Sequence, residues 1–496
     1  MELKNLNILI FYLLCLIYIS FSLLTTLDTT SLNTSAEKIL FNGKFIEWLG
    51  SSVTSSGRFV PFSNGINIFI FQFTDNLFVF FVAKIILITT NFYFLYKVFE
   101  ELKLSKFYPI AIILCLFNHS FNNAIYITSF EIELSFLITI FFYLELLNIK
   151  RNRVLIDILQ ILVLIYLLGL KESMFGFFLF YNIASYFFKI KRKNIIISSI
   201  LIIYLSTYAL IVLSSLDLDN IYGNKNIENK LIFSFIKNAS QYVISFPLIT
   251  LIFLICNITY FNFLYLKKKK LNEYEKIFIV ILAGIIGYYS VYLSLRIFAF
   301  RYVYPIIIII LPIFFYSFKS LNVRLIGFLF IVFLIGPFSS TYLGLKNQIN
   351  AKEFNIEMKQ ELIKHDNKQD ILLIHNFPDN KKYMLDGQLH DIGLIDHLKI
   401  FFKDINLIEK KYNSEIYSDL DQEELREFNL VIILFRNYQF NILDIITDIK
   451  QKETLEIERK CYQPIILKSL IFKKKCSENL KLILYDTNNS NIFNKT

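Results

Sequence analysis

The chain has 496 residues, of which 55% are hydrophobic and 17% aromatic, and its mean hydropathy is +0.51. Soluble domains are rarely this apolar, so the composition argues against a soluble protein and predicts membrane-spanning helices. The formal net charge is +10, but the basic residues form short clusters between apolar runs. That pattern is typical of cytoplasmic membrane loops and argues against a nucleic-acid partner.

The first apolar run, over 6–27, is long enough to cross a bilayer. No small-residue cleavage site follows it, so we predict an uncleaved first span. Further runs of spanning length lie at 76–98, 107–124, 128–148, 154–170, 173–188, 195–215, 239–264, 277–295, 302–318 and 325–344. The predicted fold class is a polytopic α-helical membrane protein, with about eleven transmembrane helices in a domain over 1–345.

Basic clusters at alternate connections predict the orientation. They lie at Glu101–Lys106, Lys150–Arg153, Lys189–Lys193, Lys267–Lys270 and Lys319–Arg324. The positive-inside rule places all of these clusters in the cytoplasm, which requires a cytoplasmic N-terminus and an extracytoplasmic C-terminal segment. We interpret the chain as a multi-pass protein of a bacterial inner (plasma) membrane.

The first outer loop, over 28–75, opens with a carboxylate, Asp28, directly after the first span. A single Asp at such a place usually ends one helix or caps the next. This loop, however, contains two apolar stretches with helical spacing, Ala36–Leu49 and Ile66–Phe73, which predict helices lying on the membrane. Two interfacial helices are more than a connector needs.

Cations recur at the predicted outer ends of the spans. Lys171 and Glu172 lie between two hydrophobic segments with almost no loop, and charge at membrane depth indicates function by default. Arg296 and Arg301 could bind phosphate through their guanidinium groups, or could contact lipid headgroups. Lys84 lies about two turns into the second span and could instead extend outward to the interface.

Two acids, Glu131 and Glu133, lie near the outer end of the fourth span. Either could hold a divalent cation, orient a substrate or simply lie at the interface. One carboxylate beside several cations suits the transfer of a lipid-linked phosphosugar. The cations would hold the phosphate and stabilise the leaving charge, while the carboxylate would take a proton from an acceptor hydroxyl.

The segment over 346–496 is charged and mixed, and it predicts a small extracytoplasmic α/β domain. Strand-like runs lie at Ile371–His375 and Leu430–Phe435, with a helix-like stretch at Gly393–Phe402 between them. Cys461 and Cys476 could form a disulfide outside the cytoplasm, or could remain unpaired. Four residues of this segment lack a metal-ligand spacing and are interpreted as surface residues: His375, Asp386, His390 and Asp391.

The order of these residues resembles the glycosyltransferase C superfamily, which includes protein mannosyltransferases and lipid A aminoarabinose transferases. Asp28 after the first span, followed by Gly43-Lys44-Phe45, resembles the family's catalytic Asp and the Gly about fifteen residues later. The run Arg58-Phe59-Val60-Pro61 resembles its turn before a second interfacial helix. Lys84, Lys171-Glu172 and Arg301-Tyr302-Val303-Tyr304-Pro305 resemble its later motifs, and the likeness covers about 1–345.

The resemblance implies an inverting glycosyltransferase that uses a polyprenyl-phosphate-linked sugar donor and a lipid, glycan or protein acceptor. Asp28 would be the general base. Many members carry a second acid directly after this Asp, but here Thr29 follows, so Glu37 is the reserve candidate. The donor phosphate would bind to Lys171, Arg301, Arg296, Lys84 and Arg58, and the secondary acids would be Glu131, Glu133 and Glu172. No cofactor is implied with certainty, and a divalent cation stays open.

Other functions remain in view. A transporter or flippase for a lipid-linked sugar would use the same cations without a base, but the repeated halves and broken helices of transporters are not recognised here. A polymerase or ligase would place its large outer loop between late spans. A non-catalytic member of the same superfamily would explain the missing acid after Asp28.

Overall fold

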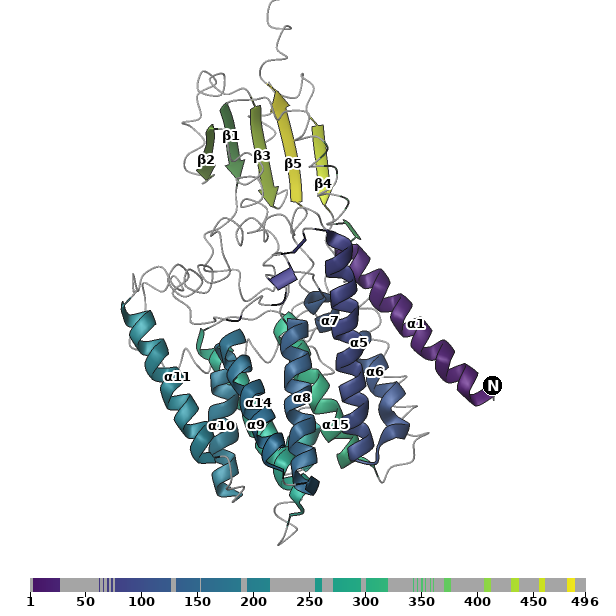
Figure 1. Cartoon of the computed structure of the whole chain (residues 1–496). Helices are drawn as coiled ribbons and strands as arrows, with labels where there is room; N and C mark the ends of the chain where they lie inside the picture. The colour runs from purple at the N-terminus through teal and green to yellow at the C-terminus, as the bar shows by residue number, and fades with distance from the viewer. Residues whose placement is uncertain are drawn as a thin grey trace, which may run out of the picture.

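The computed structural model describes the following residues: 3–26, 62, 66, 69–70, 73–74, 76–125, 131–151, 153–188, 194–214, 255–260, 271–295, 300–319, 342, 346, 349–350, 353, 357, 360, 370–375, 406–411, 430–436, 455–459 and 480–486. Helices dominate the first part of the chain, and strands occur after it (Figure 1).

The long helices follow the predicted apolar runs closely. They are α1 (Leu3–Thr26), α5 (Leu77–Glu101), α8 (Glu131–Arg151), α9 (Val154–Leu170), α10 (Ser173–Phe187), α11 (Asn194–Ser214), α14 (Glu273–Leu295) and α15 (Tyr304–Ser317). Shorter helical segments lie between some of these long helices: η1 (Ser105–Phe107), α6 (Tyr108–Leu116), α7 (His119–Ala124) and η2 (Phe300–Val303). Within the described part of the chain, three stretches are long and apolar enough to span a bilayer: Phe78–Glu101, Glu131–Arg151 and Glu273–Tyr292. These helices indicate an integral membrane protein.

The prediction of one continuous span over 107–124 is wrong. Helix α6 has nine residues, about 14 Å at the usual rise, which is too short to cross the apolar core of a bilayer. Asn118 adopts extended backbone angles, and its side chain accepts a hydrogen bond from the Ser120 N–H at 2.9 Å. This N-cap starts a separate helix, α7, because it satisfies a backbone donor that a continuous helix would have paired internally.

Helix α15 lies at the centre of the helical part. Five consecutive isoleucines, Ile306–Ile310, are all at most 2% exposed. A helix that is apolar on every side is stable only when other helices surround it. Helix α9 instead has one outward apolar side, where Leu155, Ile158 and Leu162 are exposed, as expected of a surface that contacts lipid.

Helices α10 and α14 cross at glycines. A Cβ atom added to Gly176 would collide with the Gly287 carbonyl oxygen, and one added to Gly287 would collide with the Gly176 carbonyl oxygen. The two backbones therefore approach closely because neither residue has a side chain, which is a common device between membrane helices. This crossing lies about one turn from Ser173 on α10 and from Tyr292 on α14.

The strands after the helices form a single mixed sheet in the order β2-β1-β3-β5-β4. They are β1 (Asp370–His375), β2 (Asn406–Lys411), β3 (Leu430–Arg436), β4 (Leu455–Arg459) and β5 (Leu480–Asp486). Strand β1 pairs in parallel with β2 and β3, whereas β5 pairs antiparallel with β3 and β4. The two predicted strands are confirmed as β1 and β3, and the sheet stands apart from the helices in Figure 1. The predicted helix at 393–402, Cys461 and Cys476 lie outside the described residues.

Candidate functional site

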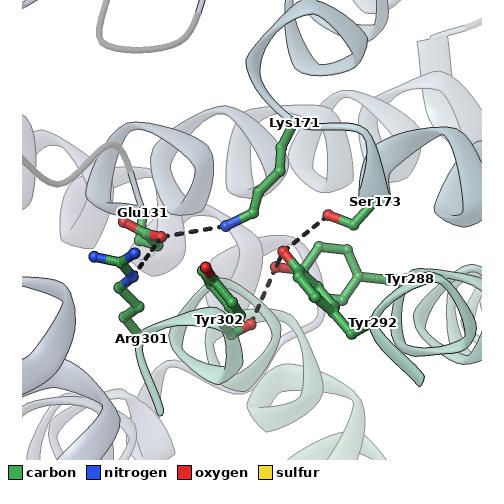
Figure 2. Close-up of polar contacts among 7 residues, drawn as sticks. All are labelled: Glu131, Lys171, Ser173, Tyr288, Tyr292, Arg301 and Tyr302. Carbon is green, nitrogen blue, oxygen red and sulfur yellow. Dashed lines mark hydrogen bonds and ion pairs between the residues drawn. The ribbon is translucent and has the colours of Figure 1, made fainter. Parts of the chain in front are cut away.

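A buried carboxylate, Glu131, joins two cations that are far apart in the sequence. Its Oε1 atom lies 3.2 Å from the Lys171 Nζ atom and 3.3 Å from the Arg301 Nε atom (Figure 2). The Glu131 side chain is fully buried and that of Lys171 is 3% exposed. We call these three side chains the ion cluster; Lys171 and Arg301 lie 130 residues apart in the sequence, so the fold brings them together.

Lys171 occupies the sharp junction between α9 and α10. Its backbone is extended, with φ −158° and ψ 133°, so α9 ends at Leu170. Only Lys171 and Glu172 separate that residue from Ser173, where α10 begins. Because this connection is so short, the positions of α9 and α10 determine where the Lys171 side chain lies.

Arg301 comes from η2, the turn that leads into α15. Pro305 occupies the first turn of α15, where its lack of an N–H costs no helical hydrogen bond. The Arg301 side chain is 31% exposed, unlike its two buried partners in the ion cluster. Figure 2 shows that Arg301 and Lys171 approach the Glu131 oxygen from different sides. A ligand would therefore approach the ion cluster from the Arg301 side.

Tyrosine rings support the Lys171 ammonium. Its Nζ atom lies 3.5 Å from the centroid of the Tyr302 ring and 5.5 Å from that of Tyr292. The two rings are stacked, with centroids 4.6 Å apart and an angle of 14° between their planes. A cation over an aromatic face is attracted by the ring quadrupole, so this stack stabilises Lys171 without neutralising its charge.

A chain of hydroxyl groups fixes this stack. The Ser173 hydroxyl donates to the Tyr292 hydroxyl at 3.1 Å, and that hydroxyl donates to the Tyr288 hydroxyl at 3.3 Å. Tyr288 then donates to the backbone carbonyl of Tyr302 at 3.1 Å (Figure 2). The chain links α10, α14 and η2, and it holds the backbone next to Arg301 in place.

The second acid, Glu133, has a different environment. Its Oε1 atom accepts a hydrogen bond from the Tyr166 hydroxyl on α9 at 2.7 Å. The Tyr166 ring stacks on Phe62 from the predicted first outer loop, with centroids 4.9 Å apart and nearly parallel planes. The Phe62 N–H also donates to the Gly169 carbonyl at 2.9 Å. One described residue of that loop thus contacts the helix end that precedes Lys171.

Lys84 on α5 lies within electrostatic reach of both acids. It is 5% exposed, so the alternative that it extends outward to the interface does not describe this structure. Its ammonium is close enough to Glu133 and Glu131 to be attracted by both carboxylates. A buried cation near two buried acids keeps the local charge small, which lowers the cost of placing ionised groups among apolar helices.

The predicted site residues thus divide into two sets. Lys171, Arg301 and Glu131 are in contact, with Lys84 and Glu133 beside them and the partly exposed Glu172 next to Lys171 in the chain. The remaining predicted residues lie outside the described part of the chain: Asp28, Glu37, Arg58 and Arg296.

The sequence interpretation missed the aromatic partners. Tyr288 and Tyr292 are spaced i, i+4 in an apolar helix, and Tyr302 directly follows Arg301. Residues spaced i, i+4 lie on one face of a helix, so this pair of tyrosines near a predicted cation could have indicated the aromatic contact. Ser173 and Phe62 carried no comparable signal.

The described residues do not bring three or more His, Cys, Asp or Glu side chains together as a metal site. No model of a known protein family matches the chain, and searches of curated proteins and of solved structures found no match. The geometry therefore carries the functional argument. Two cations that converge on one point, beside an aromatic stack, can bind an anionic group such as phosphate.

Proposed function

We propose that the protein is an inverting glycosyltransferase that moves a sugar from a polyprenyl-phosphate donor to a lipid, glycan or protein acceptor. The proposal includes about eleven spans in a bacterial inner membrane, a cytoplasmic N-terminus, and an extracytoplasmic α/β domain built on the sheet of β1–β5. The reaction would take place at the outer face of the membrane.

The observation that carries this proposal is the convergence of Lys171 and Arg301 on one carboxylate oxygen. Cations that served only to contact lipid headgroups would lie on separate outward surfaces, whereas these two meet inside the bundle. The ion cluster lies at the ends of apolar helices, where the phosphate of a membrane-bound donor would reach it. Phe62 of the first outer loop contacts the same region, which supports a role for that loop near the substrate.

In the proposed reaction, Lys171 and Arg301 bind the donor phosphate and stabilise its charge as the bond to the sugar breaks. Asp28 takes the proton of the acceptor hydroxyl while the acceptor oxygen forms a bond to the anomeric carbon. The bond between that carbon and the phosphate oxygen breaks, and polyprenyl phosphate leaves with the electron pair. Glu37 is the reserve base. Arg58, Arg296 and Lys84 are further candidates for phosphate binding, and Glu133 and Glu172 for secondary acids.

The test is sugar transfer in proteoliposomes that contain a polyprenyl-phosphate sugar and an extract of candidate acceptors. Asp28→Asn is expected to lower the transfer rate by a factor of about 10² or more, because it removes a general base. Asp157→Asn is the matched control, since Asp157 lies in the first turn of α9, at the other end from Lys171.

Full activity of the Asp28→Asn variant would contradict the proposed base. A protein that moves the labelled donor across the bilayer without consuming it would instead be a lipid-linked-sugar flippase. Intact binding with neither transfer nor transport would favour a non-catalytic member of the superfamily.

A further inference from the structure

The ion cluster shares a single carboxylate oxygen between two cations. Lys171 and Arg301 both approach the Oε1 atom of Glu131, at 3.2 and 3.3 Å. An ammonium has three N–H donors and a guanidinium has five, so both groups suit an anion that presents several acceptor oxygens. A phosphate group offers more acceptor oxygens and up to one more negative charge at the same point.

Glu131 therefore occupies the place that an anionic ligand needs. Any phosphate that binds both Lys171 and Arg301 must displace the Glu131 carboxylate or crowd against its negative charge. Two negative groups that contact the same cations repel each other strongly inside a protein, because the effective dielectric constant there is well below that of water.

The position of Glu131 allows the carboxylate to exchange partners. It is the first residue of α8, and because helical side chains lean toward the N-terminus, its fully buried side chain extends past the end of the helix. Lys84, on the neighbouring helix α5, already attracts Glu131 and Glu133. A carboxylate that leaves Lys171 and Arg301 thus stays within the electrostatic reach of another buried cation and does not become an uncompensated buried charge.

We propose that Glu131 is an internal ligand of the phosphate site: its carboxylate fills the site when no ligand is bound, yields to an incoming phosphate by shifting toward Lys84, and returns to expel the product. This inference deepens the proposed function and rests on it for the identity of the ligand. The shared chemistry is a phosphate group, either on a polyprenyl chain or as the free ion.

This exchange of Glu131 for the phosphate would help the product to leave the site. The donor phosphate is a diester with one negative charge, whereas the released polyprenyl phosphate is a monoester that carries up to two. Two fixed cations would therefore hold the product more tightly than the donor. A carboxylate that competes for the same cations weakens both complexes and keeps the product from blocking the site.

The experiment measures binding with the full-length protein in nanodiscs of zwitterionic lipid. Glu131→Gln removes the competing charge and keeps the shape of the side chain, so we expect it to bind polyprenyl phosphate at least about tenfold more tightly than the wild type. Glu145→Gln is the matched control. Glu145 lies on the same helix about 21 Å further along, where it accepts hydrogen bonds from Gln160 and Tyr181, and this variant is expected to bind like the wild type.

Two further arms identify the ligand source and the site. Titration with inorganic phosphate shows whether the tighter binding of the Glu131→Gln variant requires the lipid chain. Tighter binding of both ligands indicates that the phosphate group alone is recognised, whereas tighter binding of polyprenyl phosphate alone indicates a lipid-linked ligand; either result supports the proposal. The double variant Glu131→Gln with Lys171→Gln is expected to lose the gain. A gain that survives this double substitution would place the phosphate elsewhere and overturn the proposal.

Binding by Glu131→Gln that is unchanged or weaker than wild type would also overturn the proposal, provided that its unfolding midpoint matches that of Glu145→Gln. In the transfer assay, Glu131→Gln is expected to lower KM for the donor and kcat together, because the product leaves slowly. If transfer fails in every variant while the binding gain persists, the glycosyltransferase proposal fails and the internal ligand stands. If transfer proceeds but the gain is absent, only the internal ligand fails.

Discussion

The crossing of α10 and α14 at Gly176 and Gly287 gives a sharp prediction about stability. Gly287→Ala adds one methyl group that points at the Gly176 carbonyl oxygen, which belongs to backbone and cannot rotate away. Relief requires the two helices to separate by on the order of 1 Å, and overpacking of this kind costs about 1–3 kcal/mol. The greater helix propensity of alanine offsets at most about 1 kcal/mol of that cost.

The same separation would reach the candidate site. The hydrogen bond between the Ser173 and Tyr292 hydroxyls is 3.1 Å long and joins the same two helices about one turn away. A shift on the order of 1 Å takes this pair beyond hydrogen-bonding distance. Gly287→Ala is therefore expected to lower both the stability and the phosphate affinity of the protein.

The assay is equilibrium unfolding in mixed micelles with increasing sodium dodecyl sulfate, followed by far-UV circular dichroism. Gly284→Ala is the control, because its added methyl group would meet the Phe177 ring at 2.9 Å, and a ring at the end of a side chain can turn aside. We expect Gly287→Ala to unfold at a clearly lower detergent fraction than Gly284→Ala. If the two variants unfold together at the wild-type midpoint, the close backbone approach is not a source of stability.

Three further substitutions test neighbouring contacts. Gly169→Ala would push its methyl group into the Phe62 ring, so we expect limited proteolysis of the 28–75 loop to become faster than in the wild type. Tyr166→Phe removes the hydrogen bond to Glu133 and is expected to cost about 1.5–3 kcal/mol in the same unfolding assay, whereas an unchanged midpoint would mean that this bond contributes nothing. Asn118→Ala removes the N-cap of α7 and should cost about 1 kcal/mol, with equal stability of the variant arguing against the cap.

Long apolar runs made most of the helical fold predictable. The run over 154–170 became α9 with the same limits, because lipid-facing and core-facing residues are both apolar and the charged residues at each end fix the limits. The same reliance on apolar runs gave the wrong prediction of one continuous span over 107–124. Hydropathy averages over Asn118, whereas the fold depends on that one side chain and its hydrogen bond to the Ser120 N–H.

The site was predictable in its charged members and not in its neutral ones. Lys171, Arg301 and Glu131 were recognisable because ionised groups are costly near a membrane and so stand out in the sequence. Their pairing was not predictable, since helical spacing locates a side chain on its own helix but not against another. The spacing of Tyr288 and Tyr292 hints at a shared helix face, but Ser173 and Phe62 look like ordinary residues in the sequence, and only the packing reveals their contacts.

The ion cluster also constrains how the chain is assembled. Synthesis proceeds from the N-terminus, so Glu131 enters the membrane first, Lys171 follows 40 residues later, and Arg301 arrives 130 residues after that. Until α15 is in place, Glu131 and Lys171 have only each other within the ion cluster, and an intramembrane charge without a partner costs about 2.5–3.5 kcal/mol on insertion scales. The pairing of Glu131 with Lys171 would therefore hold α8 and the α9–α10 junction together during insertion, before the third charge completes the cluster.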